Sequence, residues 1–96
     1  LLKLGSYQEA IGRLDRVIDL NPNFAKAWYS RGAAYRRLGL FDAAIASYDR
    51  ALQIQPDFIE AWYCKGLSQA HAGQNQMAIT SYDRVLKLNP NFHLAW

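Results

Sequence analysis

The sequence repeats itself with a period of 34 residues. The tripeptide Ala27-Trp28-Tyr29 returns as Ala61-Trp62-Tyr63, and Gly39 returns as Gly73. The prolines have the same spacing, and they stand at Pro22, Pro56 and Pro90. A fixed period of this length is typical of stacked repeats. The period therefore predicts a stack of similar units, an architecture that presents surfaces to partners more often than it forms a catalytic pocket.

Composition is compatible with such a stack. Of the 96 residues, 51% are apolar, which is enough for a packed core. The net charge of +3 is spread along the chain and forms no basic block. Cys64 is the only cysteine, and no signal peptide or apolar run of about 20 residues occurs. These features predict an intracellular, cytoplasmic protein without a membrane segment. Because the sequence starts at Leu1 without a methionine, we expect it to be a fragment of a longer array.

Each full unit reads as a helical hairpin. Apolar residues recur at helical spacing over about residues 24–38 and again over about residues 42–54. Gly39 lies between the two stretches and suits the left-handed conformation that ends a helix. Asn23 and Asp42 are expected to cap the two helices through their side chains. The unit is therefore predicted to be two antiparallel helices joined by a short turn.

Small residues mark the point where the two helices cross. Gly32 and Ala44 fall at that crossing, where a larger side chain would hold the backbones apart. Trp28 and Tyr48 are expected to cover the hairpin from either helix. One hairpin cannot bury so wide an apolar face, so we expect the next hairpin to cover it.

These residues resemble the pattern of the tetratricopeptide repeat family, and the resemblance covers nearly the whole chain. It divides the sequence into a partial repeat at 1–24 (the end of a first helix plus a second helix), full repeats at 25–58 and 59–92, and the start of a further repeat at 93–96. The implied fold is all-α, an α-solenoid of antiparallel helical hairpins. The positions that carry the repeat core are Trp28, Gly32, Tyr35, Ala44, Tyr48, Ala51, Pro56, Trp62, Gly66, Ala78, Tyr82 and Pro90.

Some positions depart from the family pattern. Gln69 stands where Tyr35 stands in the preceding repeat, which predicts looser packing in the last unit. Arg31 and Lys65 occupy a position that is usually leucine. Matching acids in the second helices lead us to expect ion pairs within each hairpin, which would join Arg31 to Asp49 and Lys65 to Asp83.

The resemblance implies a right-handed superhelix whose first helices line a concave groove that binds partner peptides or helices. Tyr29 and Tyr63 follow the core tryptophans and suit recognition, because an aromatic ring with a polar tip offers much contact area. The alternative is that both tyrosines pack between adjacent first helices. Arg36 could bind a carboxylate through two hydrogen bonds. The candidate groove residues are Lys26, Tyr29, Ala33, Arg36, Glu60, Tyr63 and Leu67, with Ala70 beside them.

Other chemistry is sparse in this sequence. Cys64 and His71 are about 10 Å apart along a helix and cannot share one zinc ion. No nucleophile–base pair, phosphate loop or pair of carboxylates is apparent. One subfamily grips a terminal carboxylate, but Tyr29, Ala33, Glu60 and Cys64 replace the residues that would do so. We therefore predict no enzyme activity, no metal or other cofactor, and no small-molecule substrate.

Three classes of function remain. The first is a protein-interaction scaffold that binds a peptide or helix of a partner in the groove. The second is a helical-repeat module that binds RNA, which the absence of a basic stripe disfavours. The third is a docking or regulatory segment of a larger enzyme. We also expect self-association through apolar ends, at Leu1, Leu2 and Leu4 and at Ala95 and Trp96.

Overall fold

A computed structural model of the chain describes residues 4–91, all of whose regular structure is helical. None of the helices within this range is long and apolar enough to cross a membrane. The expectations about Leu1, Leu2, Ala95, Trp96 and the further repeat at 93–96 lie outside the described residues, as does the side chain of Leu4. The helices are α1 (Leu4–Leu20), α2 (Ala25–Arg37), α3 (Phe41–Ile54), α4 (Ile59–His71) and α5 (Asn75–Leu88).

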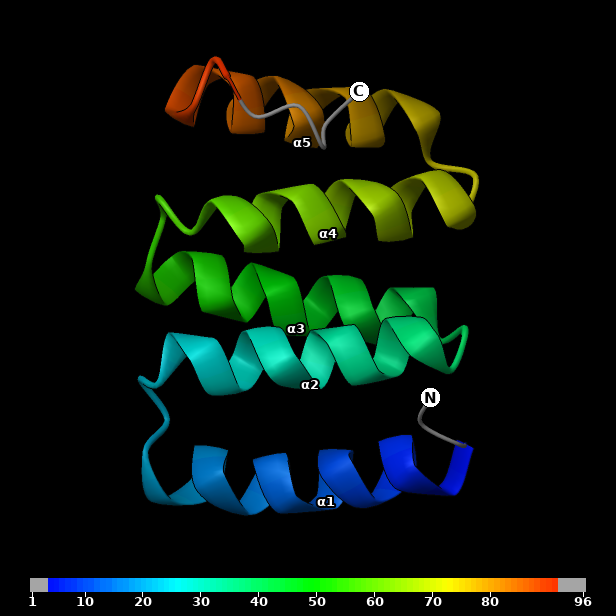
Figure 1. The fold of residues 1–96 in the computed structure, drawn as a ribbon, viewed down its shortest axis with the longest axis vertical. Helices are drawn as coiled ribbons and strands as arrows, with labels where there is room; N and C mark the ends of the chain where they lie inside the picture. The colour runs from blue at the N-terminus through cyan, green and yellow to red at the C-terminus, as the bar shows by residue number, and fades with distance from the viewer. Residues whose placement is uncertain (1–3, 92–96) are drawn as a thin grey trace.

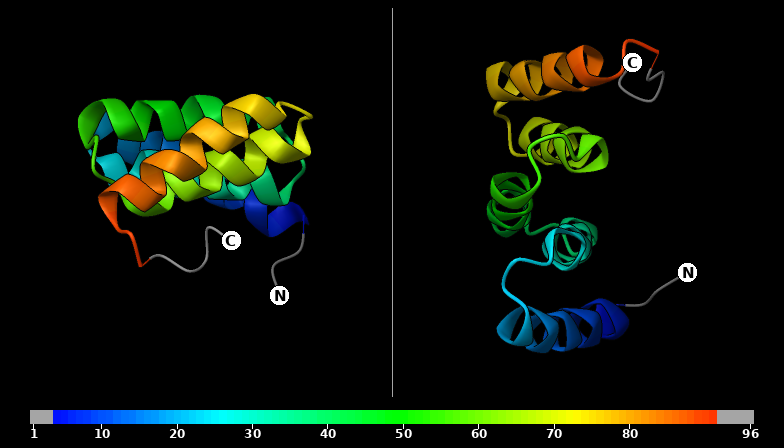
Figure 2. Two further views of the ribbon diagram at one scale, coloured as in Figure 1. Left: turned by 90° about the horizontal axis from the view of Figure 1, so that it is seen from above. Right: turned by 90° about the vertical axis from the view of Figure 1, so that its left-hand side faces the viewer.

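The helices follow one another in a single stack (Figure 1). Each helix packs against its neighbours in the sequence, and α2 also touches α4, the first helix of the next hairpin. Figure 2 shows α3 displaced to one side of α2 and α4, so that the chain zigzags between two layers. The predicted α-solenoid of antiparallel hairpins is confirmed, and α2 and α3 end within one residue of their predicted bounds.

The turn inside each hairpin depends on one glycine. Gly39 has a φ of 79° and Gly73 a φ of 82°, in the left-handed region that favours glycine. After α2, the backbone N–H of Leu40 donates to the carbonyl of Tyr35 at 2.9 Å, and that of Gly39 donates to Arg36 at 3.0 Å. These two bonds form a Schellman motif, which satisfies carbonyls that the end of the helix leaves without partners.

The predicted side-chain caps are wrong. The residue that precedes α2 is Phe24, and Leu40 precedes α3; neither helix start has a side-chain cap hydrogen bond. Asn23 lies one residue too early to cap α2, and Asp42 lies inside the first turn of α3. A carboxylate at that position still favours the helix through its dipole.

The crossing of α2 and α3 is as close as the small residues predict. A Cβ atom added to Gly32 would lie 2.7 Å from Cε1 of Tyr48, and one added to Gly66 would lie 2.6 Å from Cε1 of Tyr82. Ala44 and Tyr48 are fully buried at this contact. At this crossing, an aromatic ring of the core therefore lies directly on a helix backbone.

The positions that carry the repeat pattern differ in burial. The fully buried ones come from helix interiors, while both prolines lie in exposed turns. The aromatic positions other than Tyr48 are partly buried. The buried set is Gly32, Ala44, Tyr48, Ala51, Gly66 and Ala78; the partly buried set is Trp28, Tyr35, Trp62 and Tyr82; the exposed set is Pro56 and Pro90.

Each repeated tryptophan is held in the same way. Nε1 of Trp28 donates to the carbonyl of Pro22 at 2.8 Å, and Nε1 of Trp62 donates to that of Pro56 at 2.8 Å. The guanidinium carbons of Arg31 and Arg50 lie 5.5 and 5.6 Å from the centre of the Trp28 ring. These distances allow cation–π attraction, so the two arginines contact the tryptophan as well as water.

The expected ion pairs within hairpins are wrong, because each cation pairs with the preceding second helix. Nε of Arg31 lies 3.1 Å from Asp15 on α1, not near Asp49. Nζ of Lys65 lies 2.6 Å from Asp49 on α3, not near Asp83. These pairs join one hairpin to the hairpin before it. Because they are partly exposed, each contributes no more than about 1 kcal/mol.

Gln69 is buried, and its environment is not the loose packing that the sequence predicts. Its side-chain oxygen accepts a hydrogen bond of 2.7 Å from the Ser81 hydroxyl across α4 and α5. Gln69 is 1% exposed and Ser81 is 2% exposed. A buried polar group with a partner avoids the cost of an unsatisfied one, so the pair replaces the aromatic contact at this position.

Candidate functional site

The candidate groove residues all belong to the two first helices, which touch each other. Lys26, Tyr29, Ala33 and Arg36 lie on α2, and the remaining members of the set lie on α4. The charged residues Lys26 and Glu60 are exposed. The others are partly exposed, namely Tyr29, Ala33, Arg36, Tyr63 and Leu67, while Ala70 beside them is exposed.

Tyr29 joins the two first helices. Its hydroxyl lies 3.7 Å from Sγ of Cys64 on α4. Its ring centre is 4.9 Å from that of Phe58 and 5.8 Å from that of Tyr48, in tilted arrangements that favour aromatic contact. Tyr29 therefore packs between adjacent first helices and keeps part of its surface open to solvent. The packing interpretation describes these contacts, while a role of Tyr29 in recognition stays a prediction.

The environment of Tyr29 changes its acidity. Burial, and then the neighbouring Cys64 thiol, raise the pKa of Tyr29 from 10.0 to about 12. Burial also raises the pKa of Tyr48, which lies deeper in the same cluster. A deprotonated phenol is disfavoured here, so both rings remain neutral at physiological pH.

This raised pKa predicts a loss of stability in alkali. The folded protein holds the Tyr29 proton more tightly than the unfolded chain, so the contribution is complete below about pH 10. It is lost as the pH rises through about 12. Denaturant midpoints measured from pH 9 to pH 12 should fall more steeply for the native sequence than for Tyr29→Phe. Equal slopes for the two proteins would contradict the packing of Tyr29 described above.

Tyr63 has an equivalent place in the next hairpin. Its ring centre lies 6.0 Å from that of Tyr82, as Tyr29 lies against Tyr48. Burial raises the pKa of Tyr82, followed by the effect of Tyr63. The two tyrosines of the candidate groove thus repeat one geometry along the stack.

A neighbouring hollow adds residues that sequence reasoning missed. A groove of about 410 Å³ lies between α1 and α2, and its lining is largely apolar. Its α2 side includes Ala33, a predicted groove residue, and its α1 side was not predicted. The sequence signal was present, since Ala10 matches Ala44 in the period. The α1 lining consists of Tyr7, Ala10 and Leu14.

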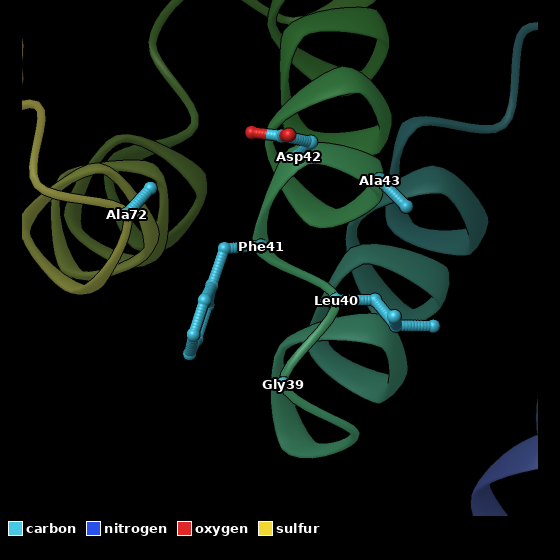
Figure 3. Close-up of a pocket in the computed structure, with 6 residues that line it drawn as sticks. All are labelled: Gly39, Leu40, Phe41, Asp42, Ala43 and Ala72. Carbon is cyan, nitrogen blue, oxygen red and sulfur yellow. The ribbon is translucent and has the colours of Figure 1, made fainter.

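A second hollow lies at the turn between α2 and α3, bordered by Ala72 after α4 (Figure 3). Figure 3 shows Leu40 and Phe41 pointing to opposite sides of the turn. Phe41 stacks on His71, with 5.0 Å between ring centres. Because the side chains diverge and few polar groups face a common point, this hollow lacks the features of a ligand site.

Within residues 4–91, no group of three or more histidine, cysteine or acidic side chains could hold a metal ion. Cys64 is a free, buried thiol. Its neighbours are the aromatic residues around Tyr29, where a small side chain fits.

Comparisons with known proteins agree with this geometry. Family models described as tetratricopeptide repeat match residues 1–59 and residues 59–92. A search of curated protein sequences gave no match. Among solved structures, the first tetratricopeptide domain of Spaghetti (RPAP3) bound to the HSP90 peptide SRMEEVD has a TM-score of 0.92 and 28% identity. That match covers 95% of this chain and 72% of the other.

Two further structures show the same fold. MamA has a TM-score of 0.84 and 33% identity over 88% of this chain, which spans 46% of the MamA chain. YrrB, described as having an unusual peptide-binding site, has a TM-score of 0.88. At 24% identity, over 96% of this chain and 47% of the other, YrrB supports the fold alone. With both family models in register with the observed hairpins, the chain belongs to the tetratricopeptide repeat family.

Proposed function

We propose that this chain is a non-catalytic protein-interaction scaffold that binds an extended peptide or a helix of a partner protein. The binding surface is the concave face of α2 and α4. The observation that carries the proposal is a strip of partly exposed aromatic, apolar and basic side chains across two touching helices. Tyr29, Arg36, Tyr63 and Leu67 form this strip.

The composition of the strip suits peptide recognition. Aromatic residues and arginine are enriched where protein interfaces concentrate their binding energy. Tyr29 is already fixed by Tyr48 and Phe58, so little side-chain entropy would be lost on binding. The relative with 28% identity is described as bound to a peptide, which supports the same class of ligand.

The RNA-binding alternative has less support. An RNA-binding surface needs free cations in a basic stripe. Within residues 4–91, four cations lie over tryptophan rings, namely Arg31, Arg50, Lys65 and Arg84. Two of them also pair with aspartates. This engagement favours a protein partner over a nucleic acid.

A selection from a displayed random peptide library tests the proposal. The binding of the enriched peptides is then measured for the native sequence, for Leu67→Glu and for Ile79→Glu. Leu67 belongs to the strip, while Ile79 lies on the second helix α5 and is 52% exposed. Both changes introduce the same charge at an accessible apolar position.

We expect Leu67→Glu to weaken peptide binding at least about tenfold, as a charge does when it enters an apolar contact. Ile79→Glu should leave the affinity unchanged. Equal loss in the two variants, or loss only in Ile79→Glu, would place binding elsewhere. Circular dichroism of both variants establishes that the helices are intact.

A further inference from the structure

A polar cluster lies inside the strip, between α2 and the buried face of α3. Tyr29, Arg36, Tyr48 and Cys64 interact with one another in this cluster. Tyr48 is fully buried, while Tyr29 and Arg36 keep part of their surface open. The cluster therefore connects the core of the hairpin to the partly exposed face of α2.

Two polar atoms in this cluster are left without partners. Within residues 4–91, neither Nε of Arg36 nor the hydroxyl of Tyr48 has a hydrogen-bond partner, and both atoms are buried. Burial lowers the pKa of Arg36, but the Tyr48 hydroxyl together with Cys64 and Tyr29 outweighs burial, so the pKa is raised. The two groups are thus close enough to interact, although they do not form a hydrogen bond of good geometry. Arg36 remains charged, and its neighbours balance that positive charge only in part.

The charges around the cluster favour an anion. The two ion pairs found within residues 4–91 engage Arg31 and Lys65, and neither includes Arg36. Glu60 is the acidic group whose charge reaches Tyr29, and it does not pair with Arg36. An incoming carboxylate would supply the counter-charge that Arg36 lacks.

We propose that Arg36, beside the ring of Tyr29, binds the side-chain carboxylate of an aspartate or glutamate within an extended partner peptide. This inference rests on the proposed function and names the chemistry of its ligand. A guanidinium can hold one carboxylate through two hydrogen bonds. The face of the Tyr29 ring would contact the methylene stem of the same side chain.

A side chain suits this position better than a chain terminus. Arg36 is partly recessed, so the carboxylate has to reach inward on a stem while the peptide backbone passes over the strip. A terminal carboxylate sits directly on the backbone and would need donors at the surface. On α4, Glu60 and Leu67 stand at the positions of Lys26 and Ala33 and supply no cationic donor.

The experiment uses a random peptide library fused at the peptide C-terminus, so that displayed peptides offer side-chain carboxylates only. Enriched peptides are synthesised with each acid in turn replaced by its amide, Glu→Gln or Asp→Asn. Their affinities are measured for the native sequence, for Arg36→Gln and for Arg37→Gln. Arg37 is the matched control, because it carries the same charge next to Arg36 but lines the groove between α1 and α2.

We expect one acidic position to be enriched, and its amide form to bind the native sequence about tenfold more weakly. Arg36→Gln should lose the same factor for the acidic peptide and show no further loss for the amide peptide. Arg37→Gln should bind the acidic peptide nearly as the native sequence does. The change on the peptide side leaves the protein intact, so the test holds even if Arg36→Gln disturbs folding.

Four outcomes would overturn the inference. The inference is refuted if the enriched peptides show no preference for an acid. It is also refuted if Arg36→Gln and Arg37→Gln weaken peptide binding equally. In both cases the scaffold function still stands. A second library, fused at the peptide N-terminus, offers free C-termini, and binders found only there would assign the carboxylate to the chain end instead. If neither library yields a binder, the proposed function fails and this inference fails with it.

Discussion

Tyr48→Ala should lower the free energy of unfolding by about 3–5 kcal/mol, the cost typical of removing a buried aromatic side chain. Tyr48 is the largest of the fully buried side chains in residues 4–91, at 0% exposure. Its ring lies against the backbone of Gly32 and beside Tyr29. Because helices cannot approach further to refill the space, a cavity would remain. Urea unfolding followed by circular dichroism measures the loss.

Tyr48→Phe is the matched control for that change. The hydroxyl of Tyr48 is buried and has no hydrogen-bond partner, so its removal should change stability by less than about 1 kcal/mol. The contrast isolates the ring from its polar atom. A cost for Tyr48→Phe as large as that for Tyr48→Ala would show that the hydroxyl, and not packing, stabilises the hairpin.

Gly32→Ala should destabilise the protein, although alanine is the better helix former by about 1 kcal/mol. The added Cβ would lie 2.7 and 2.8 Å from two carbons of the Tyr48 ring, closer than carbon atoms pack. The ring is fully buried and cannot move aside without displacing α3. Overpacking of this kind costs about 1–3 kcal/mol, so the clash exceeds the gain in propensity.

The same substitution at Gly12 should have the opposite effect on stability. Gly12 lies within α1 and is exposed, and nothing comes within 4 Å of a Cβ added there. Without a clash, the change should stabilise the protein by about 0.5–1 kcal/mol. Thermal unfolding of both variants should give shifts of opposite sign. Shifts of the same sign would contradict the close crossing of α2 and α3.

Much of this fold follows directly from the sequence. The period places the helices, because apolar spacing and the recurring Gly39 and Gly73 act within a few residues of where they stand. The close approach at Gly32 is predictable for the same reason, since only a residue without a side chain fits there. Local geometry and steric contact are therefore the features that can be predicted most directly from a repeated sequence.

The pairing of charges could not be predicted in this way. A periodic sequence offers Arg31 two aspartates at equivalent positions, Asp15 before it and Asp49 after it. Which one it meets depends on how the hairpins stack, and the structure places Asp15 nearer. The helix caps were predicted wrongly for a related reason. Phe24 and Phe58 occupy the cap positions, and the contact of Phe58 with Tyr29 crosses between hairpins.

In the candidate groove, too, local features could be predicted from the sequence and contacts between helices could not. The sequence marks Tyr29 and Arg36 as members of one helix face, but it does not show that Tyr48 from α3 lies beneath them. Nor does it show that α1 completes a hollow next to Ala33. Both features come from contacts between helices, which depend on packing angles and not on spacing along the chain.

The ion pairs that join successive hairpins also give the stack a direction. In each pair the acid comes from the earlier hairpin and the cation from the later one, Asp15 with Arg31 and Asp49 with Lys65. Such an interface is heterologous, since the two surfaces that meet are different. A hairpin inserted in the reverse orientation would set acid against acid and cation against cation. The charge pattern thus selects head-to-tail growth, in which every unit added to the superhelix presents the same surface to the next.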